Sequence, residues 1–429
     1  MKIKYGVTYS EILNSPRKKE QKPKRPSFFL RTLIRVVSLP DLWATKFTYT
    51  TKGMERLGKK EPCLILMNHS SFIDLKIVNR IFYPRKYNIV CTSDGFIGKD
   101  MLMRYIGCIP TKKFVTEVSL LHDMMYAVKR YNSSILMYPE ASYSFDGTAT
   151  PIPESLGRCI KMLGIPVVMI KTSGAFTRDP LYNNLQLRKV KVSATVEYLL
   201  SPDDIKEKNP REINAILREQ FSFDNFRWQK ENGVKVTEPF RADHLNRVLY
   251  KCPHCLAEGK TEGKGTTLTC HACGKQYELC EDGSMRALSG DTEFSHIPDW
   301  YAWERECVKQ EIISGDYSLD VDVDIYAMID TKCIYSIGEG RLTHNREGFH
   351  LTGCDGELDY IQKPLASYSL YADYYWYKLG DIICIGNKDI LYYCFPKTDC
   401  DVVAKTRLAA EELYKIVRSE KRSKPTDSE

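Results

Sequence analysis

The sequence has no long hydrophobic run. None of its apolar stretches reaches the ~20 residues that a membrane-spanning helix needs. No apolar core follows the first basic residues, so a secretory signal is not expected. The 15 cysteines are an odd number, and most stand singly inside apolar segments, which is typical of a reducing compartment. The sequence therefore predicts an intracellular protein that is not integral to a membrane.

Composition and charge are those of a globular protein with an uneven distribution of basic residues. Hydrophobic residues make up 43% and charged residues 27% of the 429 residues, and this length predicts two or three domains. The formal net charge is +7, and basic residues gather in "SPRKKEQKPKRP" (15–26). Such a run predicts a flexible basic tail over residues 1–26, suited to an anionic surface of either nucleic acid or lipid headgroups.

An amphipathic helix is predicted over residues 27–47. Ser27 suits the N-cap position, and Pro40 is expected to stop the helix. Two interpretations remain open. The helix either packs on its own domain as an ordinary surface helix, or lies in the headgroup layer of a membrane with its aromatic residues as anchors. The apolar face carries Phe29, Leu33, Val36 and Val37.

Strand-like and helix-like segments alternate from about residue 48 to residue 200. Continuous apolar strands separated by helices indicate a sheet that is covered on both faces. This pattern predicts an α/β domain, a mixed sheet flanked by helices, over residues 48–250. The strand candidates are residues 63–68, 88–93, 134–139, 165–172 and 191–199.

The first of these strands leads directly to a histidine. "LILMN" ends just before His69, and Asp74 follows on an early turn of the next predicted helix. Ligands of α/β sheets gather at the carboxyl ends of strands, and a carboxylate there can orient an imidazole as a base. Because no G-x-S-x-G nucleophile elbow occurs, the pair would activate a substrate hydroxyl directly. The alternative is that His69 only caps the helix.

Four motifs in order resemble the glycerolipid acyltransferase family of the 1-acylglycerol-3-phosphate O-acyltransferase (PlsC) type. "NHSSFID" carries the family's N-H-x4-D pattern, and "GCIPTKK" (107–113) stands where the family has a G-x-I-x-x-x-R-like stretch. "YPEASYS" (138–144) is similar to the F-P-E-G-T-R-S motif, and "IPVVMI" (165–170) to the V-P-V strand. The resemblance covers residues 45 to 200, approximately, and does not extend to the rest of the chain.

The resemblance implies an O-acyltransferase of phospholipid biosynthesis. The donor would be an acyl thioester, acyl-ACP or acyl-CoA, or an acyl phosphate, and the acceptor a lysophospholipid. The first acceptor implied is 1-acyl-sn-glycerol-3-phosphate, which gives phosphatidate. His69 would be the general base and Asp74 its orienting carboxylate, without a catalytic cofactor. The acceptor-binding residues implied are Glu140, Ser142, Lys112 and Lys113.

The chain departs from the family's motifs at several positions. The family's Gly-Thr-Arg is here Ala141-Ser142-Tyr143, and the basic position after "GCIP" is lysine rather than arginine. Tyr143 stands where the family has a cation, and lysine lacks the bidentate geometry of arginine. Binding of an acceptor phosphate is therefore predicted to be weaker than with the family's motif. Two alternatives therefore stand beside the first function: an acyltransferase for a different lipid acceptor, or a non-catalytic lipid-binding or scaffold protein.

Two cysteine pairs predict a zinc ribbon over residues 251–285. Cys252, Cys255, Cys270 and Cys273 follow a C-x2-C-x14-C-x2-C spacing, and four thiolates can close tetrahedrally on Zn²⁺. A closed site of four cysteines has no open coordination position, so a structural Zn²⁺ is expected. Partner docking and nucleic-acid binding are the alternatives. No cluster of basic and aromatic residues surrounds the pairs, so nucleic acid is not expected as a partner.

The remaining chain is predicted to be rich in β-strands. "LDVDVDIYAMID" (319–330) alternates apolar and polar residues, and "DVVAKTRLAAEELYKIV" (401–417) reads as one closing helix. This order of elements predicts a β-rich, pleckstrin-homology-like domain. We expect a peripheral protein on the cytoplasmic face of a membrane. The predicted parts are a tail (1–26), a membrane-surface helix (27–47), the acyltransferase domain (48–250), the ribbon (251–285), the β-rich domain (290–420) and a tail (421–429).

Overall fold

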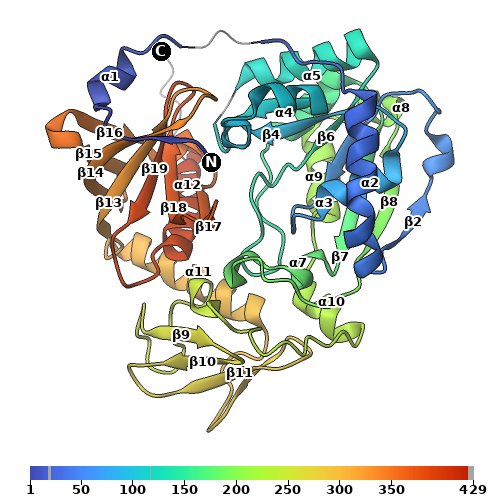
Figure 1. The fold of residues 1–429 in the computed structure, drawn as a ribbon. Coiled ribbons are helices and arrows are strands. Elements are labelled where there is room, and N and C mark those ends of the chain that lie inside the picture. The colour runs from blue at the N-terminus through green and yellow to red at the C-terminus, as the bar shows by residue number, and fades with distance from the viewer. Residues whose placement is uncertain (18–20, 116, 424–429) are drawn as a thin grey trace. The chain divides into compact units, whose positions relative to one another are not determined.

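In the computed structural model the chain forms two compact units (Figure 1). The described residues are 1–17, 21–115 and 117–423. Parts of both predicted tails, residues 18–20 and 424–429, lie outside them. The α/β unit comprises residues 18–181 and 185–236. The second unit, called the C-terminal unit, comprises residues 1–17, 182–184 and 237–429, so residues 237–250 of the predicted acyltransferase domain belong to it.

A seven-stranded mixed sheet forms the α/β unit, in the order β2-β8-β7-β3-β6-β4-β5. The five strands from β7 to β5 are parallel, whereas β8 runs antiparallel to β7 and pairs in parallel with the edge strand β2. This arrangement confirms the predicted mixed sheet. The strands are β2 (Thr48–Lys52), β3 (Leu64–Met67), β4 (Tyr87–Thr92), β5 (Cys108–Thr111), β6 (Ser134–Met137), β7 (Val167–Ser173) and β8 (Ser193–Leu200).

Helices cover both faces of this sheet. Successive side chains of a strand point to opposite faces, and the four residues of β3 are all buried. Ile65 packs in one core cluster with Ile77 of α3, whereas Leu66 packs in a second cluster with Met124 of α5. The continuous apolar run of β3 therefore reflects two cores, one on each side. The helices are α2 (Phe28–Ala44), α3 (Asp74–Phe82), α4 (Asp100–Ile106), α5 (Val118–Tyr131), α6 (Leu156–Leu163), α7 (Ala175–Arg178), α8 (Pro202–Glu207), α9 (Pro210–Gln220) and α10 (Asn225–Glu231).

Helix α2 extends past the proline that was expected to end it. Ser27 is the N-cap, and its side chain accepts a hydrogen bond from the backbone of Leu30, as predicted. Pro40 lies inside the helix, which continues to Ala44. Leu42, beyond the proline, is buried in the core of the α/β unit. Packing of this last turn therefore outweighs the lost backbone hydrogen bond.

The start of the chain is part of the C-terminal unit rather than a flexible tail. β1 (Ile3–Lys4) pairs in parallel with β14, and α1 (Tyr9–Leu13) begins at a capping box. The hydroxyl of Tyr9 lies 2.6 Å from that of Tyr392, and the side chain of Ile12 is buried. Those buried apolar residues explain why this part of the predicted basic tail is ordered.

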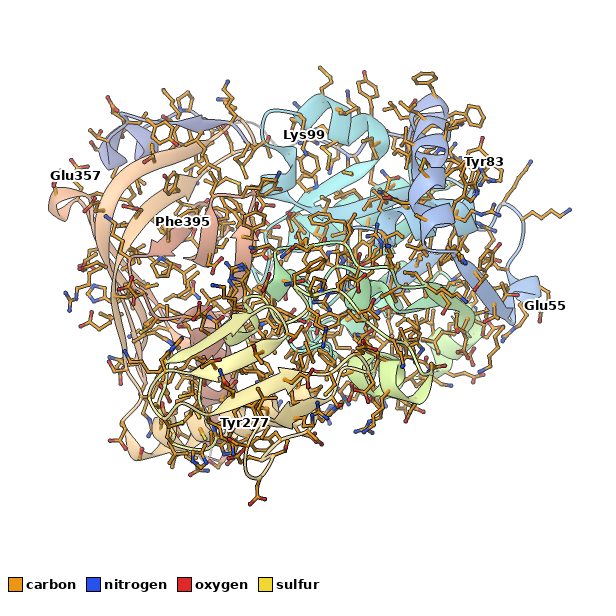
Figure 2. The ribbon with its side chains drawn as sticks, turned by 60° about the horizontal axis from the view of Figure 1, so that its bottom comes forward. Glu55, Tyr83, Lys99, Tyr277, Glu357 and Phe395 are labelled. Atoms are coloured by element: carbon orange, nitrogen blue, oxygen red, sulfur yellow. The ribbon has the colours of Figure 1, made fainter. Side chains whose placement is uncertain are left out.

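The region of the cysteine pairs contains a four-stranded antiparallel sheet, in the order β12-β11-β10-β9, in which Cys270 ends β10. Its strands are β9 (Thr261–Lys264), β10 (Thr267–Cys270), β11 (Gln276–Leu279) and β12 (Met285–Ala287). A helix that the sequence pattern did not predict follows, α11 (Ile297–Ser314). Trp300 of α11 is fully buried, with its ring centroid 4.9 Å from that of Tyr277, which is labelled in Figure 2.

The β-rich region is an antiparallel sheet followed by one helix, as the sequence pattern predicted. The strand order is β16-β15-β14-β13-β19-β18-β17, with β1 added to β14. The identity of this region as a pleckstrin-homology-like domain stays a prediction. The elements are β13 (Leu319–Met328), β14 (Ile334–Asn345), β15 (Gly348–Gly353), β16 (Leu358–Gln362), β17 (Tyr371–Trp376), β18 (Gly380–Gly386), β19 (Leu391–Pro396) and α12 (Val403–Ser423).

Candidate functional site

His69 and Asp74 form a hydrogen-bonded pair at the carboxyl end of β3. The Nδ1 atom of His69 lies 3.0 Å from Oδ2 of Asp74, the first residue of α3. The same oxygen accepts hydrogen bonds from the backbone amides of Ser70 (3.0 Å) and Ser71 (3.1 Å). The Asp74 side chain is 2% exposed and that of His69 is 22% exposed. A carboxylate that accepts from Nδ1–H leaves Nε2 as the basic nitrogen.

Asn68 fixes the loop that carries His69. Its Oδ1 accepts hydrogen bonds from the backbone amide (2.8 Å) and the hydroxyl (3.1 Å) of Thr172 on β7. Its amide group donates to the hydroxyl of Ser70 at 3.1 Å. Asn68 is fully buried, so these bonds tie the end of β3 to the neighbouring strand.

Glu140 holds the backbone of the same loop. Its Oε2 accepts from the backbone amide of His69 at 2.9 Å, and its Oε1 accepts from the amide (2.8 Å) and hydroxyl (3.2 Å) of Thr150. The residue is 1% exposed. The carboxylate is thus turned inward to the protein backbone, and a part for Glu140 in acceptor binding stays a prediction. Ala141 follows with φ +56°, a left-handed conformation that suits the glycine of the resembled motif.

Two tyrosines stack on the imidazole of His69. The ring centroids of Tyr138 and Tyr143 lie 4.4 Å and 4.1 Å from that of His69, with interplanar angles of 30° and 29°. Burial, followed by the nearby charge of Asp74, raises the pKa of the Tyr138 hydroxyl well above its usual value. Phe72 lies beside Tyr143 at 5.6 Å and is 61% exposed. The sequence pattern did not predict this aromatic cluster, although all three residues lie within or beside the two motifs.

A second buried carboxylate lies behind the pair. Asp179 is hydrogen-bonded to the hydroxyl of Ser71, and its Oδ2 accepts from Nη1 of Arg178 at 3.0 Å. Burial raises the pKa of Asp179 to about 7, with a further rise from Asp74, against the opposing effects of Ser71 and Arg178. Asp179 was missed from the sequence, where its only signal is that it follows β7, a neighbour of β3.

The other predicted acceptor-binding residues lie in the loops that follow β6 and β5. Ser142 is buried, and its hydroxyl donates to the carbonyl of Tyr143 at 3.5 Å. Lys112 and Lys113 are half-buried and directly follow the edge strand β5. β5 lies three strand spacings, roughly 14 Å, from β3. The two lysines therefore follow a strand end at the same edge of the sheet as His69, three strands away from β3.

Helix α2 exposes an apolar face to solvent and buries Arg31, Ser38 and Leu42. Arg31 is buried, and its Nη1 donates to the carbonyls of Pro84 (2.8 Å) and Arg85 (3.0 Å). Tyr83, labelled in Figure 2, receives the guanidinium of Arg35 over its ring at 4.7 Å. The exposed apolar face comprises Phe28, Phe29, Leu33, Val36, Val37 and Trp43, which are 46–72% exposed.

A surface helix of a globular protein normally buries its apolar stripe, so this orientation argues against the ordinary surface helix. Among the described residues, no helix combines the length and the apolar content that crossing a bilayer requires.

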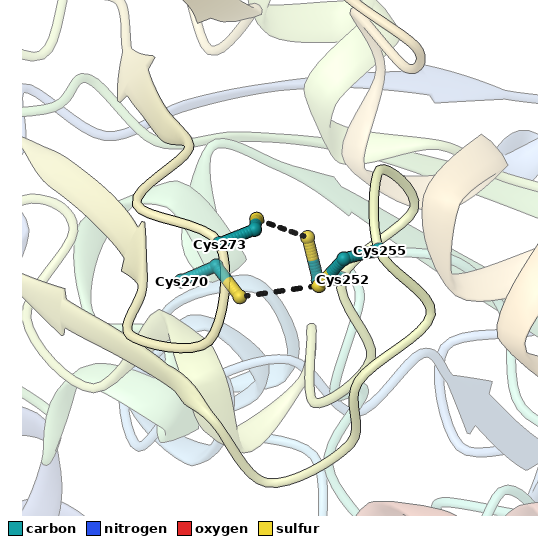
Figure 3. A group of neighbouring side chains, drawn as sticks. All are labelled: Cys252, Cys255, Cys270 and Cys273. Carbon is teal, nitrogen blue, oxygen red and sulfur yellow. Dashed lines mark hydrogen bonds between the residues drawn. The ribbon is translucent and has the colours of Figure 1, made fainter.

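The four paired cysteines form a cluster with the geometry of a tetrahedral metal site (Figure 3). Their sulfur atoms all lie within 4.8 Å of one another, with Cys252 to Cys273 at 3.9 Å and Cys255 to Cys270 at 3.7 Å. A Zn–S bond of about 2.3 Å in a tetrahedron places sulfur atoms ~3.8 Å apart. The separations exceed the ~2.05 Å of a disulfide bond. The four thiols therefore fit a zinc ion, and Gly274 makes the following turn with φ +76°.

Comparison with known proteins relates the α/β unit to acyltransferases. Residues 48–173 match the family described as Acyltransferase. A chloroplastic 1-acyl-sn-glycerol-3-phosphate acyltransferase of Brassica napus is 29% identical over 31% of this chain and 41% of its own length. 1-Acyl-sn-glycerol-3-phosphate acyltransferase beta of Homo sapiens is 22% identical over 28% of this chain and 45% of its own length. The chain thus spans less than half of the length of these relatives.

Among solved structures, the chain is similar to the 1-acyl-sn-glycerophosphate (LPA) acyltransferase PlsC from Thermotoga maritima. It aligns with 45% of this chain and 79% of its own, at 14% identity and a TM-score of 0.34. The family match over residues 48–173 includes His69, Asp74 and Glu140. That segment of the chain is thus similar to acyltransferase domains.

Proposed function

We propose that the α/β unit is an O-acyltransferase that moves a fatty acyl group from an acyl thioester to the hydroxyl of a lysophospholipid. Nε2 of His69 takes the hydroxyl proton as the acceptor oxygen attacks the thioester carbonyl carbon. The C–O bond forms, the C–S bond breaks, and the proton passes to the leaving thiolate. The observation that carries this proposal is the His69–Asp74 hydrogen bond of 3.0 Å inside the matched domain.

The surrounding residues support a base of fixed orientation. Asp74 holds Nδ1, Glu140 holds the backbone amide of His69, and the rings of Tyr138 and Tyr143 limit rotation of the imidazole. A base held in one orientation loses little entropy when the substrate hydroxyl arrives. We assign Glu140 to this positioning role. Lys112 and Lys113 remain the proposed contacts for a distal anionic group of a substrate.

Phosphatidate formation from 1-acyl-sn-glycerol-3-phosphate is the first reaction to test, because both curated relatives are named for that acceptor. A different lipid acceptor is the second candidate. It is favoured by one observation: Tyr143, in place of a cation, packs 4.1 Å from the imidazole. An aromatic ring beside the base offers an apolar surface rather than a charge for a phosphate.

Helix α2 supports attachment to the surface of a membrane. Six large apolar side chains point outward along one helix, and the buried Arg31 fixes this orientation. Burying such a face in the headgroup layer contributes ~1.5–3 kcal/mol for each fully buried large side chain. We place the protein at the cytoplasmic face of a membrane, where its lipid acceptor resides. The cluster of four cysteines would hold a structural Zn²⁺ that stabilises the ribbon without entering the reaction.

A transfer assay over donors and acceptors tests the proposal. The full-length protein is incubated with labelled acyl-ACP or acyl-CoA and with lysophosphatidate, other lysophospholipids or monoacylglycerol in vesicles. We expect acylated product with at least one pair, and the preferred acceptor distinguishes the two candidates. If the protein binds lipid but no donor–acceptor pair gives product, the proposed enzyme is contradicted and the lipid-binding scaffold is favoured.

A further inference from the structure

Asp179 is a carboxylate that is almost completely removed from solvent beside the proposed catalytic pair. Its side chain is 3% exposed, and it follows α7 at the end of β7, next to β3 in the sheet. It does not belong to any of the four motifs that resemble the acyltransferase family. A buried carboxylate is costly unless it is paired and hydrogen-bonded, so its partners indicate what it does.

Ser71 connects this carboxylate to the pair. The hydroxyl of Ser71 donates to Oδ1 of Asp179, while the backbone amide of Ser71 donates to Oδ2 of Asp74 at 3.1 Å. Ser71 is 1% exposed, and its hydroxyl also accepts from the amide of Ile73 at 3.2 Å. One serine thus fixes the first turn before α3 and links both carboxylates. The hydrogen-bonded chain runs from Asp179 through Ser71 and Asp74 to Nδ1 of His69.

The charges around Asp179 come from three helices. Arg178 on α7 pairs with it directly, and Asp74 on α3 repels it. The guanidinium of Arg178 is shared, because its Nη2 lies 3.7 Å from Oδ1 of Asp41 on α2. Asp41 is in turn paired with Lys76 of α3. Among the residues that the structure describes, Arg178 is the cation that pairs with Asp179, and it is shared with Asp41.

We propose that Asp179 is a positioning residue for the proposed transfer, acting on the His69–Asp74 pair through Ser71. The inference rests on the proposed function. Ionised Asp179 orients the hydroxyl of Ser71 and adds negative charge behind Asp74. When the imidazole takes the acceptor's proton it becomes a cation, and a buried negative charge nearby stabilises that cation. Neutral Asp179 keeps its place but does not supply this charge.

The sign of the pH dependence follows. Because burial raises the pKa of Asp179 to about 7, the residue is mainly neutral below that pH and mainly ionised above it. The contribution of its charge to kcat is therefore absent in mild acid and present in mild base. Asp179→Asn keeps the size of the side chain and an oxygen that can accept from Ser71, but it is neutral at every pH.

The test compares kcat of the wild type and Asp179→Asn as a ratio across pH. We expect the ratio of wild-type kcat to variant kcat to be near one at about pH 5.5 and to rise to about ten at about pH 8.5. A tenfold ratio corresponds to about 1.4 kcal/mol of transition-state stabilisation. KM for the acceptor should change little. Asp203→Asn is the matched control, because Asp203 is 84% exposed on α8 and pairs only with Lys206 among the contacts of the described residues. A ratio that does not change with pH overturns the proposal.

Two further measurements separate this inference from the proposed function. NMR of the His69 imidazole, identified by its loss in His69→Ala, should show that its titration moves to lower pH in Asp179→Asn. An unchanged titration overturns the link even if transfer is observed. In a double-mutant cycle, Ser71→Ala and Asp179→Asn should have non-additive effects on that titration, because they break the same connection. Absence of transfer in the wild type contradicts the proposed function alone, since the titration is measured without substrate.

Discussion

Tyr143 stacks on the imidazole of His69, with ring centroids 4.1 Å apart, at the position where the resembled motif has arginine. The neighbouring Tyr138 stacks at 4.4 Å, so two aromatic rings contact the proposed base. Aromatic rings packed on an imidazole restrict its rotation. In this chain the position therefore contacts the proposed base and contributes no charge for a phosphate.

Tyr143→Ala should reduce turnover by loosening the imidazole. An aromatic pair contributes ~0.5–1.5 kcal/mol, so we expect kcat to fall by about 2- to 12-fold. Tyr143→Phe keeps the ring and is the matched control, with kcat expected within about twofold of the wild type. Steady-state kinetics on the preferred acceptor provide the measurement. An equal loss of kcat in the two variants would mean that turnover depends on the hydroxyl of Tyr143 and not on its stacked ring.

Glu140→Ala should destabilise the α/β unit as well as slow transfer. The substitution leaves the part-buried amides of His69 and Thr150 without their acceptor, and each unsatisfied group costs up to ~1–3 kcal/mol. Urea unfolding followed by tryptophan fluorescence measures this loss. Glu219→Ala, at the exposed end of α9, should leave the unfolding midpoint unchanged. Unaltered stability of Glu140→Ala would contradict the tethering role drawn from the geometry.

Removing one thiol of the four-cysteine cluster should release the metal and unfold the ribbon. Cys252→Ser is expected to lose bound zinc, measured by elemental analysis, and to expose β9–β12 to limited proteolysis, because metal binding and folding are coupled in such sites. Cys280 lies outside the cluster, so Cys280→Ser should keep both zinc and protease resistance. If the wild-type protein, expressed in a zinc-supplemented medium, contained no zinc after purification, the metal site would be refuted.

The apolar face of α2 should control binding to vesicles. Val36 and Val37 are 56% and 60% exposed, so replacing both by aspartate removes ~2–4 kcal/mol of apolar contact without opening a core. We expect vesicle binding in a sedimentation assay to fall by at least about tenfold. Val118→Asp, a substitution at a residue 68% exposed on α5, is the control. Vesicle binding that is lost equally in the control would show that α2 is not the specific contact.

The sequence was most informative where one pattern determines one structure. The apolar runs before His69 and near residues 134–139 became the buried strands β3 and β6, because a strand covered on both faces must be apolar throughout. The spacing of His69 and Asp74 also predicted their hydrogen bond. A short loop joins His69 to the first residue of α3, Asp74, so the two side chains are held close together. The clustering of the four cysteines also follows from spacing alone.

Tertiary packing decided what the sequence could not show. Asp179 is 108 residues from Ser71, and only the pairing of β3 with β7 brings them together. Helix α11 was missed because charged residues interrupt its apolar positions, and Trp300 is buried by a strand from the ribbon. The orientation of α2 depends on Arg31, whose guanidinium finds carbonyl partners at Pro84 and Arg85. Amphipathicity defines two faces of a helix but does not tell which one faces the protein.

The most direct test of the account is transfer by the wild type beside His69→Ala and Asp74→Asn, with donor and acceptor saturating and folding checked by circular dichroism. If His69 is the base that Asp74 orients, kcat should fall by ~10²–10⁴-fold in His69→Ala, and Asp74→Asn should also be strongly impaired, while both variants keep the wild-type spectrum. Full transfer activity in a folded His69→Ala would contradict the proposed mechanism.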